Sequence, residues 1–125
     1  MFMTAREIKR RYQPHDPDRD LMGHETDTKL WNRKAREADQ PAHSESLEPT
    51  LGQGIRERGV EQPIALGTQF GKSNKPQVIG GHHRIGLMGK IAPDTLLPVI
   101  HHESFGAAMR SDQAARAGRA GYRYT

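Results

Sequence analysis

The sequence contains no cysteine among its 125 residues. This excludes disulfide bonds, thiolate metal sites and a cysteine nucleophile, and it fits a cytoplasmic protein. Long apolar runs are also missing, because no segment approaches the roughly 20 residues of a membrane span. Residues 1–11 lack the apolar core of a signal peptide. We therefore expect a cytoplasmic protein with no membrane partner.

Apolar and aromatic residues are scarce as well. Hydrophobic residues make up 34% of the chain and aromatic residues 6%. The length is sufficient for one small domain with one core. The low apolar content predicts that part of the chain contributes little to that core.

Charge is distributed unevenly. Residues 1–49 carry nine Lys/Arg and ten Asp/Glu, a net charge of −1, whereas residues 50–125 carry ten and five, a net charge of +5. The two segments together give the total of +4. A basic C-terminal half favours a polyanionic partner such as DNA.

Start signals predict two helices near the N-terminus. Thr4 and Glu7 have the spacing of a capping box, which predicts a helix to about Tyr12. Thr26 or Asp27 is expected to cap a second helix that ends near residue 38. The charged face of this second helix, with Lys29, Arg33, Lys34 and Arg36, is interpreted as solvated, and Trp31 as a packing residue.

Further elements follow in the C-terminal half. In order, we expect a helix Ser46–Arg58 ended by Gly59, strands Pro63–Leu66 and Gln77–Ile79 paired as a hairpin, a helix His82–Met88, a strand Leu96–Ile100 and a helix Glu103–Arg116. Together these elements predict an α/β (α+β) domain with a small mixed sheet. The expected core consists of Leu51, Ile55, Ile64, Val78, Ile79, Leu87, Met88, Leu96, Val99 and Ile100.

The most informative segment is Val78–Met88, in which a β-branched run leads through two glycines into a helix. The first turn of a helix leaves backbone N–H groups unpaired, and the helix dipole favours negative charge there. Gly80 and Gly81 would let a phosphate approach the backbone, and Arg84 would add a bidentate contact. The alternative role of Arg84 is an ion pair with Glu57, Glu61 or Asp94.

Two histidines complete this Gly-Gly-His-His-Arg box. His82 and His83 would donate to phosphate, and His83 would act as the catalytic acid or base near neutral pH. With His101 and His102 they form a four-histidine set that suits a divalent metal only if the side chains converge. Because the spacing is no known metal signature, we assign no metal site.

The order of these features resembles the ParB N-terminal domain. The segment Ile55-Arg56-Glu57-Arg58-Gly59 before Gln62-Pro63-Ile64, the box at residues 80–84, and Leu97-Pro98-Val99-Ile100 are similar to that family's helix, box and Pro-Val strand. The box also resembles the Gly-Gly-Cys-His-Arg motif of sulfiredoxin, which shares the fold. The likeness covers roughly residues 46–102.

The resemblance implies a compact α/β domain that holds a phosphate or nucleotide over the box. ParB proteins bind and hydrolyse CTP, sulfiredoxin uses ATP, and some relatives are described as nucleases. Gly80, Gly81, His83 and Arg84 would then contact phosphate, with Mg²⁺ as a possible companion of the nucleotide. His82 stands where sulfiredoxin has cysteine, which excludes that reductase chemistry. The chain resembles the stand-alone ParB-like proteins of bacteriophages and actinobacteria.

A basic tail ends the chain. It contains Arg110, Arg116, Arg119 and Arg123, with Tyr122 and Tyr124 between and beside them. Arginine with aromatics suits contact with nucleic acid backbone and bases. The alternative is a disordered, solubilising end.

We thus expect a helical extension over residues 1–45, a ParB/sulfiredoxin-like domain over 46–109 and the tail over 110–125. The leading function is DNA binding through phosphate contacts of the box and tail. The alternatives are a CTP- or ATP-binding enzyme, a metal-dependent nuclease, and a phage-type factor without catalysis that binds a host protein. The sequence assigns no oligomeric state.

Overall fold

The computed structural model describes residues 1–15, 25–40, 50–67 and 76–102. In chain order these residues form β1 (Phe2–Thr4), α1 (Ala5–Arg11), β2 (Gln13–Pro14), α2 (Asp27–Ala38), α3 (Leu51–Arg58), β3 (Ile64–Gly67), β4 (Gln77–Gly80), α4 (His82–Ile91) and β5 (Leu96–His102). The predicted α/β class is confirmed.

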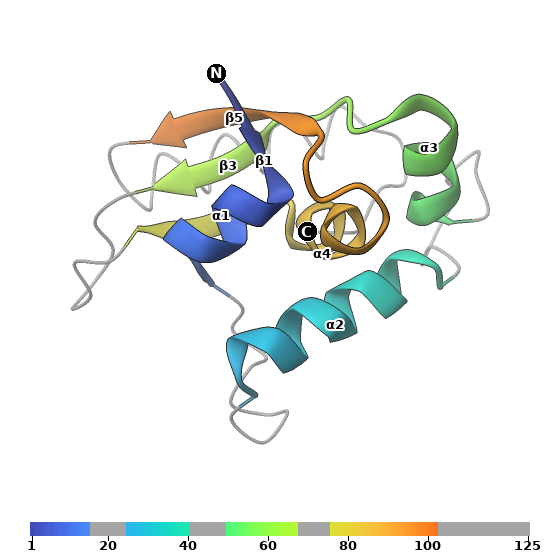
Figure 1. Cartoon of the computed structure of the whole chain (residues 1–125), viewed down its shortest axis with the longest axis horizontal. Helices are drawn as coiled ribbons and strands as arrows, with labels where there is room; N and C mark the ends of the chain where they lie inside the picture. The colour runs from blue at the N-terminus through green and yellow to red at the C-terminus, as the bar shows by residue number, and fades with distance from the viewer. Residues whose placement is uncertain (16–24, 41–49, 68–75, 103–125) are drawn as a thin grey trace.

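The strands form one mixed sheet in the order β1-β5-β3-β4-β2 (Figure 1). The pairs β1/β5 and β3/β4 are antiparallel, whereas β3/β5 and β2/β4 are parallel. The expected pairing of the strands near residues 64 and 78 is therefore confirmed. A register shift opposite Ala65 and Leu66 places an irregularity at the end of β4, directly before the box.

Residues near the N-terminus form both edges of this sheet. Phe2 lies opposite Pro98, and Gln13 lies opposite Gln77. The expected boundary at residue 46 falls outside the described residues. The described part of residues 1–40 is nevertheless not a purely helical extension, because it shares one sheet and one core with the later elements.

Threonine side chains cap the first three helices. The N–H groups of Glu7, Lys29 and Gln53 donate to the hydroxyls of Thr4, Thr26 and Thr50 at 3.1, 3.2 and 3.0 Å, respectively. The first two caps confirm the sequence analysis. The third helix differs: it begins at Leu51 after Thr50, and Ser46 lies outside the described residues.

Two helix ends were also predicted. Gly59 ends α3 with φ of 78°, as expected of a glycine C-cap. The expected end of α4 at Met88, before Gly89, is wrong, because the helix continues to Ile91. Gly89 is accommodated within it, with the side chain of Lys9 packed against its Cα.

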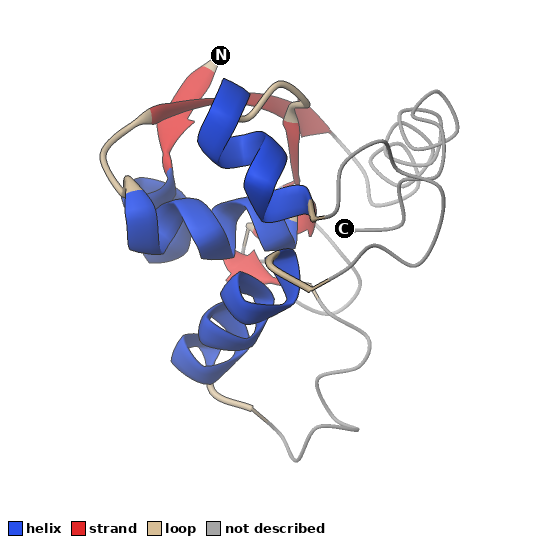
Figure 2. Ribbon diagram, turned by 90° about the vertical axis from the view of Figure 1, so that its right-hand side faces the viewer, coloured by secondary structure: helices blue, strands red, loops and turns tan. Residues whose placement is uncertain are grey.

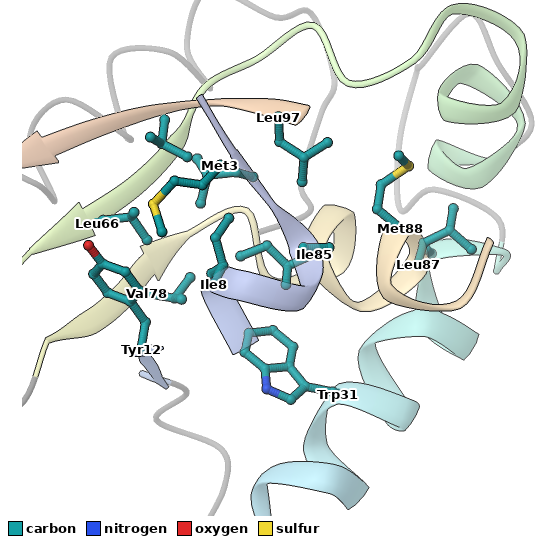
Figure 3. Packing of buried hydrophobic residues seen from close by; sticks show 14 of the residues in the cluster. Met3, Ile8, Tyr12, Trp31, Leu66, Val78, Ile85, Leu87, Met88 and Leu97 are labelled. Carbon is teal, nitrogen blue, oxygen red and sulfur yellow. The ribbon is translucent and has the colours of Figure 1, made fainter. Parts of the chain in front are cut away.

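Buried apolar side chains join the sheet to the helices (Figure 3). Met3 and Leu97 come from the sheet, Ile8 from α1 and Ile85 from α4. The prediction of Leu96 and Ile100 as core residues is wrong, since their exposed fractions are 62% and 43%. Alternate residues of a strand point to opposite faces, so Leu97 and Val99 are the buried ones.

Helix α4 lies between the sheet and α2 in both views (Figures 1 and 2). Gly86 allows this packing: a Cβ atom there would lie 2.9 Å from both the backbone N of Ala35 and the carbonyl O of Trp31. Only hydrogen fits between the two helices at this point. This contact brings the middle of α2 against the first half of α4, where the box lies.

Candidate functional site

The box begins at a glycine with a left-handed backbone. Gly81 has φ of 95° and ψ of 20° and is the N-cap of α4, and no side chain caps the helix there. A Cβ atom at Gly81 would lie 2.5 Å from Cδ1 of Ile64 in β3. Both the backbone angle and the close contact therefore require glycine.

The first turn of α4 has the electrostatic features of an anion site. The N–H of Ile85 donates to the carbonyl of Gly81 at 3.0 Å, which is the first hydrogen bond of the helix. The amides before it have no acceptor within α4, and no carboxylate belongs to this first turn. The positive end of the helix dipole lies here without an acidic residue of its own.

His82 is part of the core. Its exposed fraction is 1%, and its Nε2 accepts a hydrogen bond from the N–H of His15 at 3.1 Å. A backbone N–H is only a donor, so this ring nitrogen carries no proton. The ring also stacks on Trp31, with centroids 5.8 Å apart. His82 thus ties α4 to α2 and to the residue after β2, and Trp31 is a packing residue, as expected.

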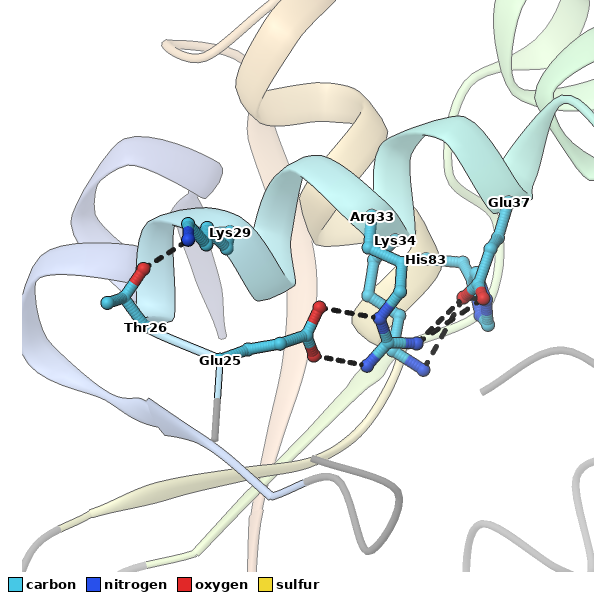
Figure 4. Close-up of polar contacts among 7 residues, drawn as sticks. All are labelled: Glu25, Thr26, Lys29, Arg33, Lys34, Glu37 and His83. Atoms are coloured by element: carbon cyan, nitrogen blue, oxygen red, sulfur yellow. Dashed lines mark hydrogen bonds and ion pairs between the residues drawn. The ribbon is translucent and has the colours of Figure 1, made fainter. Parts of the chain in front are cut away.

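His83 contacts a carboxylate on the neighbouring helix. Its Nε2 lies 3.0 Å from Oε1 of Glu37 in α2 (Figure 4). The side chain of His83 is only 8% exposed and that of Glu37 is 29% exposed. A carboxylate at this position holds the imidazole ring in one orientation, which is the arrangement of an oriented acid or base.

Glu37 also belongs to a network of ion pairs along α2 (Figure 4). Arg33 forms a two-point contact with Glu25 at 2.7 and 2.9 Å and contacts Glu37 at 3.3 Å. Lys34 lies 3.8 Å from Glu37. The side chains of Arg33 and Lys34 are each 9% exposed, so the interpretation of this face as solvated is wrong for these two residues.

The packing of α2 on α4 explains this difference. Residues of α2 that pack near Gly86 are removed from water. Glu37 lies four residues after Arg33 and three after Lys34, so it provides the opposite charge within the same helix. That spacing is visible in the sequence. The partner Glu25 precedes the helix and His83 comes from another element, so neither contact could be inferred from α2 alone.

Arg84 follows His83 and is 4% exposed. The carboxylates considered as its alternative partners have other contacts. Asp94 binds Arg6 at 2.7 Å, Glu61 binds Arg58 at 3.1 Å, and Glu57 accepts from Gln53 at 3.1 Å. Each of these three contacts lies on the exposed surface, whereas Arg84 is buried.

The second histidine pair lies near the start of β4, whereas the box lies at its end. His102 is opposite Gly67, which is in turn opposite Gln77. His101 hydrogen bonds with the hydroxyl of Tyr12. Loss of hydration lowers the pKa of His101, and the positive charges of Arg11 and His102 lower it further. Within the described residues, no group of three or more His, Asp or Glu side chains is arranged to hold a metal ion.

The remaining predicted contacts, Arg110, Arg116, Arg119 and Arg123, lie outside the described residues.

Comparison with family models, with curated proteins and with solved structures gave no match. None of the helices in the described residues has the length and apolar character needed to cross a membrane.

Proposed function

We propose that the protein binds the phosphate groups of a nucleotide at the junction of β4 and α4, with His83 as an acid or base oriented by Glu37. The observation that carries this proposal is the contact of 3.0 Å between His83 and Glu37, in the first turn of a helix that starts at an uncapped, left-handed glycine. The backbone would bind phosphate, and the side-chain pair would exchange protons with it.

The order of elements also supports a ParB-like domain. Helix α3 ends at Gly59 and leads into β3, and β4 leads through Gly80 and Gly81 into α4 before β5. This is the order of the segments on which the resemblance rests. We therefore include CTP and ATP, each with Mg²⁺, as the first ligands to test.

Burial favours a nucleotide over DNA at this site. Gly80, Gly81, His83 and Arg84 are all buried, and a ligand must displace the chain around them to reach them. A small phosphate ester needs a smaller opening than a duplex, whose phosphates lie on a broad convex surface. DNA binding through the box remains a second candidate, supported by the net charge of +4.

A thermal-shift titration tests the nucleotide proposal. A ligand that binds only the folded protein at 100 times its Kd adds about 2.7 kcal/mol to stability. CTP or ATP with Mg²⁺ should therefore raise Tm, whereas the unphosphorylated nucleosides should not. Glu37→Gln should keep the helix contact and bind nucleotide, but lose any turnover that the wild type shows. No Tm rise with any nucleoside triphosphate would overturn the proposal.

A salt titration with random duplex DNA tests the second candidate. Binding through the box predicts a steep loss of affinity with salt and weaker binding by Arg84→Gln. Because Arg84 is buried, its variant must first be shown by circular dichroism to fold. DNA binding that Arg84→Gln leaves unchanged would place the DNA elsewhere on the protein.

A further inference from the structure

The surface formed by α1 and the C-terminal end of α4 has a marked excess of cations. Four of the seven residues of α1 are basic: Arg6, Lys9, Arg10 and Arg11. Lys90 belongs to the last turn of α4. Against these five cations stand Glu7 and Asp94, which leaves a local net charge of +3 on this surface, named here the α1 surface.

The two carboxylates are already paired. Asp94 binds Arg6 at 2.7 Å, and Glu7 binds Arg11 at 2.9 Å. Within the described part of the chain, the side chains of Lys9, Arg10 and Lys90 form neither a hydrogen bond nor an ion pair. The excess charge therefore resides on three side chains: Lys9 and Arg10 belong to α1, and Lys90 belongs to the adjoining helix α4.

Lys9 is held among other cations. Its Nζ lies 3.1 Å from the point where a Cβ of Gly89 would be, so the side chain lies against the C-terminal part of α4. Partial burial lowers the pKa of Lys9, and the charges of Lys90 and Arg6 lower it further. Like charges brought together cost stability, and an anion bound between them would remove that cost.

We propose that the α1 surface binds the phosphate backbone of nucleic acid, with Lys9 and Lys90 as the central contacts. Two ammonium groups at adjoining helix ends suit phosphate oxygens, and Arg10, which follows Lys9 in α1, adds a third cation to this surface. Such contacts carry no base specificity, so the binding is insensitive to sequence. This inference does not depend on the nucleotide site at the other end of α4.

A nucleic acid fits this surface better than an anionic membrane. Helices that lie on a bilayer insert apolar side chains between the lipids. The apolar residues of α1, Ala5 and Ile8, are both 0% exposed because they face the core. Helix α1 therefore has only charge to offer a partner. At the end of α4, Ile91 is the one large apolar side chain that is exposed, at 44%, and a single such side chain beside five cations favours a phosphate backbone in water.

The test is a salt-titrated binding assay on a random duplex of about 30 base pairs, with anionic vesicles as a parallel ligand. The full chain is compared with the double variant Lys9→Gln/Lys90→Gln. The matched control is Arg56→Gln/Arg58→Gln, which removes the same charge from the exposed end of α3. The slope of log K against log salt should become shallower by about 2 in the first variant. The control should retain the wild-type slope.

The thermal stability of the same variants completes the test. Removing like-charge repulsion should leave the Tm of Lys9→Gln/Lys90→Gln equal to or above that of the wild type, so weaker binding would not be due to unfolding. A purely structural role at the end of α4 predicts the reverse, with lower Tm and unchanged DNA binding. That result would overturn the proposal, as would equal losses in both double variants or binding to vesicles without binding to DNA.

Discussion

Nε2 of His83 lies 3.0 Å from Oε1 of Glu37, and this contact joins the first turn of α4 to the last turn of α2. Gly86, three residues after His83, brings the backbones of the same two helices together. A steric contact and a polar contact therefore fix the position of α4 along α2. The histidine most suited to chemistry is held by the same packing that forms the core.

The buried and exposed arginine pairs should differ sharply in energy. Arg33 contacts Glu25 where both side chains are about a tenth exposed, whereas Arg56 contacts Asp39 where both are 45% exposed. Arg33→Met leaves Glu25, whose side chain is 10% exposed, without its cation and should cost about 3–5 kcal/mol. Arg56→Met should cost at most about 1 kcal/mol.

Urea unfolding at neutral pH measures both values. The Arg56 pair is the control, because it has the same two-point geometry with hydrogen bonds to both oxygens of Asp39. Equal losses in the two variants would mean that burial does not set the strength of the network around Glu37.

Two glycines of α4 should respond to alanine in opposite directions. At Gly86 the new methyl group meets backbone atoms of α2 at 2.9 Å, which cannot move without separating the helices. Gly86→Ala should therefore destabilise by about 1–3 kcal/mol. At Gly89 the nearest atom is the flexible end of Lys9, so Gly89→Ala should gain up to about 1 kcal/mol of helix propensity.

The free energy of unfolding of the two variants provides the comparison. Chain length, helix and substitution are identical, so only the surroundings of the methyl group differ. A Gly86→Ala protein as stable as the wild type would show that α2 can move away from α4 at little cost.

Alanine substitutions at Gly81 and Gly59 should show how much of the lost stability comes from backbone strain and how much from steric contact. Both have positive φ, 95° and 78°. Alanine at Gly59 meets nothing within 4 Å, whereas at Gly81 it meets Ile64 at 2.5 Å. Strain alone should cost about 1–3 kcal/mol at each position.

Gly81→Ala should lower the free energy of unfolding more than Gly59→Ala does, because the contact with Ile64 adds to the backbone strain. Circular dichroism melts of both variants would give the difference. The double variant Gly81→Ala/Ile64→Ala should lose less stability than the sum of the losses of the two single variants. If its loss equals that sum, the contact with Ile64 does not contribute to the cost of Gly81→Ala.

His101 should make stability depend on pH. Its pKa is lowered from the ordinary value of 6.5, so the unfolded chain binds a proton before the folded protein does. The contribution of His101 is therefore complete above about pH 6.5 and declines as the pH falls below that value. His101→Gln should remove this part of the slope.

Urea unfolding at about pH 8 and about pH 5.5 would measure the effect. The wild type should lose more stability than His101→Gln over this interval. Parallel losses would show that the burial of His101 and its nearness to Arg11 do not favour the neutral ring.

Local signals in the sequence predict most helices and the long strands. Thr4 and Thr26 act within one helical turn, and their caps are found where expected. Strands β1 and β2, of three and two residues, have no such signal. They exist because β5 and β4 supply hydrogen-bonding edges from distant parts of the sequence, which is why they could not be predicted.

The candidate site shows the same division. The glycine turn and the helix after it follow from residues 80–84, but the roles of the two histidines do not. His82 and His83 are neighbours with similar sequence surroundings, and only the positions of Trp31 and Glu37 distinguish a core ring from an oriented one. Those positions depend on how α2 packs, which no local pattern specifies.

The pairing of β1 with β5 has a consequence for how the protein is made. Phe2 and Pro98 lie opposite each other from nearly opposite ends of the described chain. A ribosome releases β1 first, but its partner strand emerges only after every other described element. Contacts this distant along the chain form slowly. We expect β1 to stay unpaired until β5 has been synthesised, and the sheet to close as a late folding step.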